Sequence, residues 1–193
     1  MLPVAAFSST PSVESETPEQ IVDNLQASLL QAMREGDELG YQGRFDFLAD
    51  VIDQSHDLDY IVRAALGTTY WNNLNEDQKN LITHTFRQLS IATYAGRFHS
   101  HGGEKFEIIE QRSLPRDQIL VRSKLIKSDG STVNFDYVFK QKEARWRIVN
   151  ILVGGVSDLA LKRVEYRAIL QRDGFLALIE MLKKKIILAE QNQ

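Results

Sequence analysis

The feature that most constrains the fold is a change in the spacing of apolar residues along the chain. Up to the Gly102-Gly103 pair, apolar residues recur every three to four positions, which is typical of amphipathic helices. From residue 104 to residue 153 they recur at every second position, which is typical of strands, and the helical spacing returns after Ser157. This order of helices, strands and helices predicts an α+β fold with a bent antiparallel sheet of about four strands.

A capping signal marks the start of the first helix. Thr17 and Gln20 have the spacing of a capping box, and Pro18 stands at the first helical position. The helix is expected to end at Gly36, and a second one is expected over residues 45–52. The first helix presents one apolar stripe, formed by Ile21, Leu25, Leu29 and Ala32.

Two further helices are predicted before the strands. Asp57 is expected to cap a helix over residues 58–66, and Gly67 is expected to end it. Asn75 and Gln78 then repeat the capping box at the start of a long helix. The expected apolar side of that helix carries Leu81, Ile82, Phe86, Leu89, Tyr94 and Phe98.

The turn Ser128-Asp129-Gly130 sets the register of the central hairpin. If these residues form a three-residue loop with a left-handed Gly130, every inward apolar residue gains an apolar or small neighbour. The resulting pairs are Leu125 with Val133, Ser123 with Phe135, Val121 with Tyr137, Ile119 with Phe139 and, on the other face, Arg122 with Asp136.

A four-residue loop, Gln-Lys-Glu-Ala at residues 141–144, is expected to join the next strand. It would place Trp146 by Phe139, Ile148 by Tyr137, Asn150 by Phe135 and Leu152 by Val133. Ser123 and Asn150 would then be the two polar residues on a continuous apolar face, and each would need a hydrogen bond. The opposite face also becomes apolar, at Val149, Ile151 and Val153, so we expect helices over residues 157–172 and 175–189 to help cover the sheet.

Length and composition fit one soluble domain. The chain has 193 residues, of which we expect 18–190 to form a single domain and 1–17 a disordered arm that is either a signal-peptide remnant or an artificial end of the sequence. The net charge of -3 argues against a nucleic-acid partner. The sequence has no cysteine and no apolar run of the roughly 20 residues that span a bilayer.

The sequence offers little support for catalysis. It has neither a phosphate-binding glycine motif nor a G-x-S-x-G motif, so we expect no cofactor and no enzyme activity. His99 and His101 lack a nearby third metal ligand, so we expect no metal. Two alternatives stay open: an interaction module with an exposed apolar patch, and an enzyme of NTF2-like fold that acts on an apolar substrate with Tyr137 or an aspartate as acid or base.

Three segments resemble the MlaC, or toluene-tolerance, family of periplasmic lipid-binding proteins. They are "WNNLNEDQKNLITHTFRQLSIATYAGRF", "VNFDYVFKQKEARWRIVNILVGGVSDLALKRVEYRAIL" and "DGFLALIEMLKKK". The resemblance extends from about Phe45 to Lys185. "SIATYAGRF" and the residues after Trp146 are most similar to the hopanoid-associated HpnM branch.

The resemblance implies a periplasmic carrier without catalytic activity. Its sheet and helices would enclose an apolar cavity in an NTF2-like cone, hold a hopanoid or a phospholipid, and exchange it with a membrane-embedded transport complex through transient membrane contact. The candidate lipid-binding residues are Leu48, Ile52, Leu66, Trp71, Phe86, Leu89, Tyr94, Phe98, Val121, Ser123, Phe135, Tyr137, Phe139, Trp146, Ile148, Asn150, Leu152, Val156 and Leu159.

Two departures from the family pattern bear on the cargo. Phospholipid carriers of this family tend to have Asn-Tyr-Arg where this chain has Leu161, Lys162 and Arg163, and an acid where it has Asn150. Both departures leave room for a hopanoid, whose fused rings are bulky and nearly uncharged.

Overall fold

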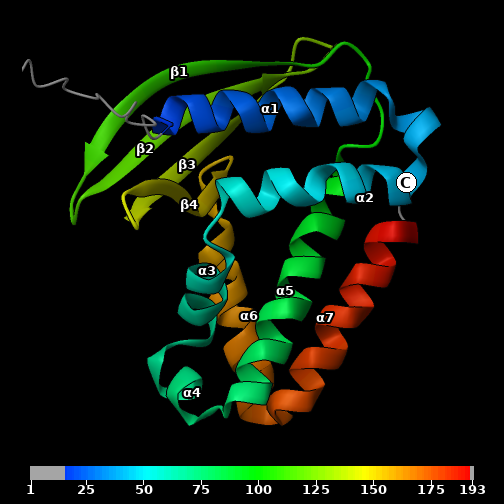
Figure 1. Ribbon diagram of the computed structural model, residues 1–193. Coiled ribbons are helices and arrows are strands. Elements are labelled where there is room, and N and C mark those ends of the chain that lie inside the picture. Colours follow the sequence, from blue (N-terminus) through cyan, green and yellow to red (C-terminus); the bar gives the residue numbers. More distant parts are fainter. Residues whose placement is uncertain (1–15, 192–193) are drawn as a thin grey trace, which may run out of the picture.

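A computed structural model describes residues 16–191 of the protein (Figure 1). The described chain is α+β, with five helices before the sheet and two after it. The predicted arm lies almost entirely in residues 1–15, outside the described residues. In chain order the elements are α1 (Pro18–Arg34), α2 (Gly36–Ser55), α3 (Leu58–Leu66), α4 (Thr68–Asn73), α5 (Glu76–Arg97), β1 (Lys105–Leu114), β2 (Gln118–Ile126), β3 (Thr132–Lys142), β4 (Arg145–Val153), β5 (Val156–Ser157), α6 (Asp158–Arg172) and α7 (Gly174–Gln191).

The capping signals that predicted the helix starts are confirmed. The backbone N–H of Gln20 donates to Thr17 Oγ1 at 3.3 Å, and the Gln20 side chain accepts from the Thr17 backbone at 2.8 Å. Asn75 and Gln78 form the same reciprocal pair at the start of α5. Asp57 caps α3, whose bounds match the prediction.

Three details of the helices differ from the expectations. The helix predicted over 45–52 is the second part of the longer α2, which is broken at Gly40, where φ is 59°. Helix α4 was not predicted, because its sequence lacks a side-chain cap and follows Gly67, which favours helix termination. Leu81 is 39% exposed, so the neighbouring Ile82, rather than Leu81, faces the core.

The five strands form an antiparallel sheet in the order β1-β2-β3-β4-β5. The register predicted for β2 and β3 is confirmed at every pair, including Ser123 opposite Phe135 and Arg122 opposite Asp136. Gly130 has a φ of 80°, as the predicted loop requires. The short apolar and turn pattern of this hairpin was therefore sufficient to set its alignment.

The register predicted for β3 and β4 is wrong. The strands are joined by a two-residue turn, Glu143-Ala144, with φ values of 51° and 61°, so Lys142 faces Arg145. An irregularity in β4 then adds one residue, so that Ile148 faces Phe139 while Asn150 faces Val138. The opposing pairs beyond it are Tyr137 with Ile151, Asp136 with Leu152 and Phe135 with Val153.

The shift changes which β4 residues share a face of the sheet. Side chains alternate along a strand, so Trp146 and Ile148 remain on the face of Phe139, as predicted. Asn150 and Leu152 lie on the opposite face, because the extra residue inverts the alternation. The face of the sheet that carries Phe135, Tyr137, Phe139, Trp146 and Ile148 is called the inner face below.

Helices cover the inner face of the sheet. Helix α1 lies along β1 and β2, and α2 runs beside α1 toward β4 (Figure 1). Helices α5, α6 and α7 pack on one another and extend away from the sheet (Figure 1). Gly96 of α5 meets the carbonyl of Ala189 in α7, where a side chain would collide. Within residues 16–191, we find no helix long and apolar enough to cross a membrane.

Candidate functional site

The inner face and its covering helices bring together most of the predicted lipid-binding residues. Those within the buried core are Leu48, Ile52, Leu66, Phe86, Leu89, Val121, Ser123, Tyr137, Phe139 and Ile148. Those partly buried against that core are Trp71, Tyr94, Phe98, Phe135, Trp146 and Leu159. Asn150 and Leu152 lie on the other face of β4, and Val156 is 54% exposed.

Six rings form a continuous row through this interior. The row begins at His56, passes to Tyr94 and Phe98, crosses to the sheet, and ends at Tyr137. Successive centroids are 5.6, 6.0, 6.4, 6.0 and 6.3 Å apart, within the range of favourable aromatic contacts. In order, the members are His56, Tyr94, Phe98, Phe106, Phe135 and Tyr137, called the aromatic row below.

A buried amide links α1 to the inner face. Gln26 is 3% exposed, and its Nε2 donates to Ser123 Oγ at 2.6 Å and to Tyr137 Oη at 3.2 Å. Ser123 therefore lies inside and is hydrogen-bonded, as predicted. Burial raises the pKa of Tyr137 to about 12, so its hydroxyl is neutral at physiological pH. Gln26 is not among the predicted site residues, although it interrupts the apolar side of the first helix.

Asn150 has a local structural role. Its Oδ1 accepts hydrogen bonds from Ser157 Oγ and from the backbone N–H of Leu159, both at 3.1 Å. These contacts satisfy the amide oxygen at the start of α6, where backbone N–H groups lack intrahelical partners. The predicted placement of Asn150 beside Phe135 is therefore wrong.

Ser55 and His56 form a second group of buried polar side chains, and His56 joins this group to the aromatic row at Tyr94. Its Nδ1 lies 2.8 Å from Ser55 Oγ, and its Nε2 lies 3.1 Å from the hydroxyl of Tyr94. Burial lowers the pKa of His56 to about 4 and raises that of Tyr94 well above its usual value. Both rings are therefore uncharged at neutral pH.

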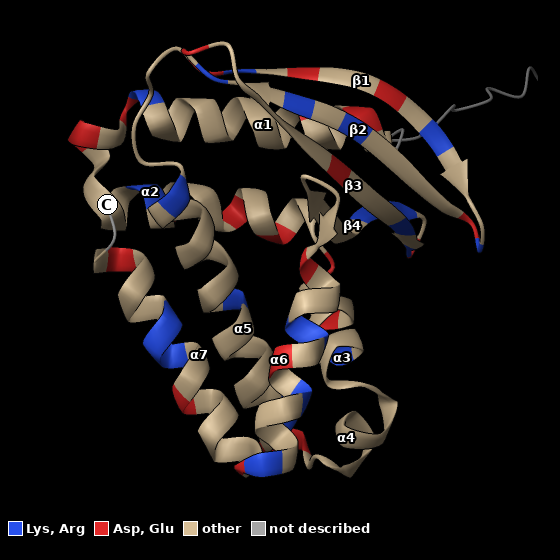
Figure 2. Cartoon of the chain, turned by 180° about the vertical axis from the view of Figure 1, so that it is seen from behind, with Lys and Arg blue, Asp and Glu red and all other residues tan. Residues whose placement is uncertain are grey.

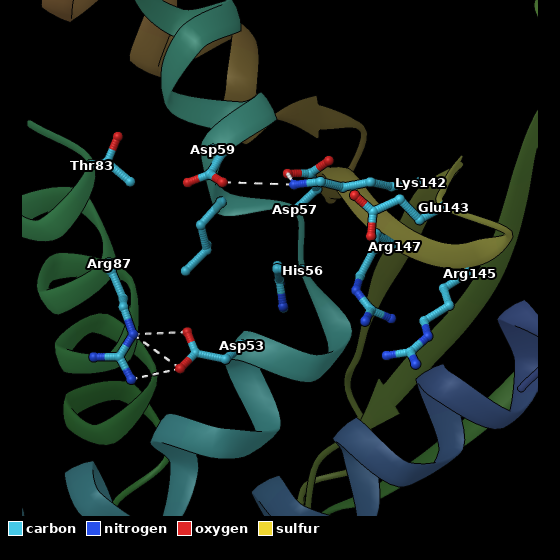
Figure 3. Close-up of a pocket in the computed structure, with 11 residues that line it drawn as sticks. Asp53, His56, Asp57, Asp59, Thr83, Arg87, Lys142, Glu143, Arg145 and Arg147 are labelled. Atoms are coloured by element: carbon cyan, nitrogen blue, oxygen red, sulfur yellow. Dashed lines mark hydrogen bonds and ion pairs between the residues drawn. The ribbon is translucent and has the colours of Figure 1, made fainter. Parts of the chain in front are cut away.

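A charged cavity of about 300 Å³ borders this interior at His56 (Figure 3). It lies between the α2–α3 junction, α5 and the β3–β4 turn. Arg87 forms a bidentate pair with Asp53, and Lys142 contacts Asp57 at 3.1 Å. The lining residues are Asp53, His56, Asp57, Leu58, Asp59, Thr83, Arg87, Lys142, Glu143, Arg145 and Arg147.

A second cavity, of about 370 Å³, lies in a groove between α1 and α2. Ile21, Leu25, Ala27 and Val51 supply its apolar lining, and Ser55, which precedes His56 in the chain, also lines it. None of the nineteen candidate lipid-binding residues lines either of these two cavities. The predicted contacts between those residues and a lipid remain a prediction.

The structure defines an α+β protein whose open antiparallel sheet buries an aromatic inner face under helices. Residues 23–184 match the family model described as MlaC protein, so the chain belongs to the MlaC family. Among solved structures, it resembles a phospholipid-binding protein from Ralstonia solanacearum that was solved in complex with a phospholipid. That similarity has a TM-score of 0.76 and 20% sequence identity, and covers 88% of this chain and 96% of the other. No curated protein gives a significant sequence match.

Proposed function

We propose that this protein is a lipid carrier that binds its cargo between the inner face of the sheet and helices α1, α2 and α5. The observation that carries the proposal is membership of the MlaC family over residues 23–184. The similarity in fold to a protein that was solved with a bound phospholipid supports it. In this proposal, residues 18–190 act as one lipid-binding domain and catalyse no reaction.

The chemistry of the interior suits a lipid body. The aromatic row supplies a long apolar surface, and the polar groups that interrupt it are neutral. Burying a sixteen-carbon tail is worth on the order of 13 kcal/mol at about 0.8 kcal/mol per methylene. A bilayer offers nearly the same free energy. A carrier therefore needs an apolar site that binds the lipid with a free energy close to that of the membrane, and not a more favourable one.

The packed interior must open to admit a lipid. Most of the candidate residues are buried against one another, so α1 and α2 would have to move away from the inner face. The break at Gly40 divides α2 into two parts, and its left-handed backbone is readily adopted only by glycine. We propose that the second part of α2 moves away from the inner face when the cargo enters or leaves.

We propose that the carrier works in the periplasm and exchanges its cargo with a membrane-embedded transport complex during transient membrane contact. Membership of the MlaC family supports this location and role. The proposed cargo is a hopanoid or a phospholipid. The departures from the phospholipid-carrier pattern at Leu161, Lys162 and Asn150 leave room for the hopanoid.

The geometry gives the enzyme alternative no support. That alternative needs a carboxylate beside Tyr137, but the Tyr137 hydroxyl contacts the amide of Gln26. The adjacent Asp136 lies on the opposite face of β3, where Arg122 binds both of its carboxylate oxygens.

Lipid identification and transfer assays test the proposal. The full chain should carry lipid through purification, as seen by native mass spectrometry, and should move labelled lipid between vesicles. Replacing Phe106 and Phe135 by alanine should reduce transfer, whereas Ile109→Ala, at an exposed position of the same sheet, should not. Absence of both bound lipid and transfer would contradict the proposal.

A further inference from the structure

Four cations occupy one face of the β3–β4 hairpin. Lys140 lies opposite Arg147, and Lys142 lies opposite Arg145, so alternation places all four side chains on the same face. Figure 2 shows the basic residues on this hairpin. Like charges directly opposite each other destabilise a sheet. The folding of the hairpin therefore does not by itself account for this arrangement.

Local contacts stabilise two of the four cations. Lys142 Nζ lies 3.1 Å from an Asp57 oxygen and 3.6 Å from an Asp59 oxygen. Lys140 Nζ lies 5.1 Å from the centroid of the Tyr60 ring, a favourable cation–π distance.

The other two cations, Arg145 and Arg147, line the charged cavity (Figure 3). Within residues 16–191, neither has an acidic oxygen within 4.0 Å. Arg147 donates to the backbone carbonyl of Trp146 at 3.1 Å. Since they are two positions apart on one strand, their side chains extend from the same face about 7 Å apart.

The acids of the cavity leave these arginines available to a ligand. Asp53 is held by Arg87, and Asp57 is held by Lys142 while it caps α3. Glu143 lies in the turn and is exposed. The lining contains four acidic and four basic residues. The two basic residues that have no acidic partner within the described chain, Arg145 and Arg147, both lie on β4.

The cavity also borders the apolar interior. His56 lines the cavity and contacts Tyr94, the second member of the aromatic row. Arg145 and Arg147 lie on the face of β4 opposite Trp146 and Ile148. A molecule with its apolar body along the row would therefore place its anionic head in the cavity by passing the edge of β4 at His56, which pairs with Ile148.

We infer that Arg145 and Arg147 bind a phosphate group in this cavity, either as a lipid headgroup or as the free anion. Guanidinium groups present planar donors that match phosphate oxygens and form charge-assisted hydrogen bonds. The headgroup form of this inference rests on the proposed lipid-carrier function. It favours a phosphate-bearing lipid over an uncharged hopanoid.

Calorimetric titrations of the delipidated full chain test the inference with three probes: inorganic phosphate, dihexanoyl phosphatidylglycerol and dihexanoylglycerol. The two lipids have the same tails, so the difference between their affinities reports the headgroup. We expect R145Q/R147Q to weaken binding of the phosphate-bearing probes about tenfold or more and to leave dihexanoylglycerol unchanged. Lys127→Gln, on the distant β2–β3 turn, removes an exposed positive charge and should change each affinity less than twofold.

The probes separate the possible outcomes. Phosphatidylglycerol binding that depends on the two arginines supports a headgroup site, whereas phosphate binding alone supports a free-anion site and overturns the headgroup form. Equal binding of both lipids by native protein and double variant overturns the inference but leaves the carrier function intact. If neither lipid binds, the carrier function fails, and the phosphate titration still decides whether the arginines form an anion site. Circular dichroism of each variant checks its fold.

Discussion

Replacing Gln26 by leucine tests whether the buried amide stabilises the junction between α1 and the inner face. Gln26 donates to Ser123 and Tyr137, which are 0% and 2% exposed. The variant removes both donors from sites that water does not reach. Each buried polar group that loses its partner costs about 1–3 kcal/mol. Added apolar burial and contact between the two hydroxyls offset part of this, so the expected net loss is about 2–3 kcal/mol.

A triple variant separates the hydrogen bonds from the packing. In Q26L/S123A/Y137F all three polar partners are apolar, so no donor or acceptor is left unpaired, and the stability should return to within about 1 kcal/mol of the native protein. Urea unfolding followed by the fluorescence of Trp71 and Trp146 measures both values, and the slope against urea should not change. At about 2–4 °C per kcal/mol, Q26L should also lower Tm by roughly 4–12 °C.

Two results would refute this reasoning. A loss below about 0.5 kcal/mol for Q26L would show that water or another group replaces the amide. A triple variant as unstable as Q26L would show that side-chain shape, rather than unpaired polar groups, determines the cost.

Three further changes have defined outcomes. Gly96→Ala should destabilise the protein by about 1–3 kcal/mol in thermal unfolding, because the new methyl group collides with the Ala189 carbonyl. Ala144→Gly should stabilise it by about 1 kcal/mol in the same assay, because Ala144 has a φ of 61°. The pKa of His56 is about 4 in the folded protein and about 6.5 when unfolded, so the unfolded chain binds more protons between these values. Stability should therefore fall by up to about 3 kcal/mol as pH drops from 6.5 to 4, and His56→Gln should remove that part of the loss.

Each of these outcomes can fail in a recognisable way. A Gly96→Ala variant as stable as the native protein would contradict close packing of α5 on α7. A destabilised Ala144→Gly variant would contradict the left-handed turn. An unchanged pH dependence in His56→Gln would show that His56 is not the group that titrates.

Local sequence signals predicted the parts of the fold that depend on local geometry. The capping boxes at Thr17 and Asn75 predicted the starts of two helices, because side chain and backbone pair within one turn. The left-handed Gly130 aligned β2 with β3 for the same reason. The β3–β4 turn could not be predicted in this way, because Glu143 and Ala144 both adopt a conformation that other residues favour more strongly.

The candidate site was predicted only in part, for a related reason. Alternation along β3 identified Phe135, Tyr137 and Phe139, because one strand's own pattern defines its faces. The charged cavity joins segments from α2, α3, α5 and the β3–β4 turn, and no local pattern records their approach. Arg145 and Arg147 alternate onto one face of β4, which is a signal for the basic wall, but the sequence does not record the approach of the α2–α3 junction to that face.

The most direct measurement of the central claim is photocrosslinking of the full chain with a lipid that carries a diazirine at the end of an acyl tail. After proteolysis, mass spectrometry locates the modified peptides. We expect adducts in β3 and in the second half of α5, where Phe135, Tyr137 and Tyr94 line the interior. Adducts confined to exposed apolar positions such as Val164 and Leu176, on the outer helices, would contradict it.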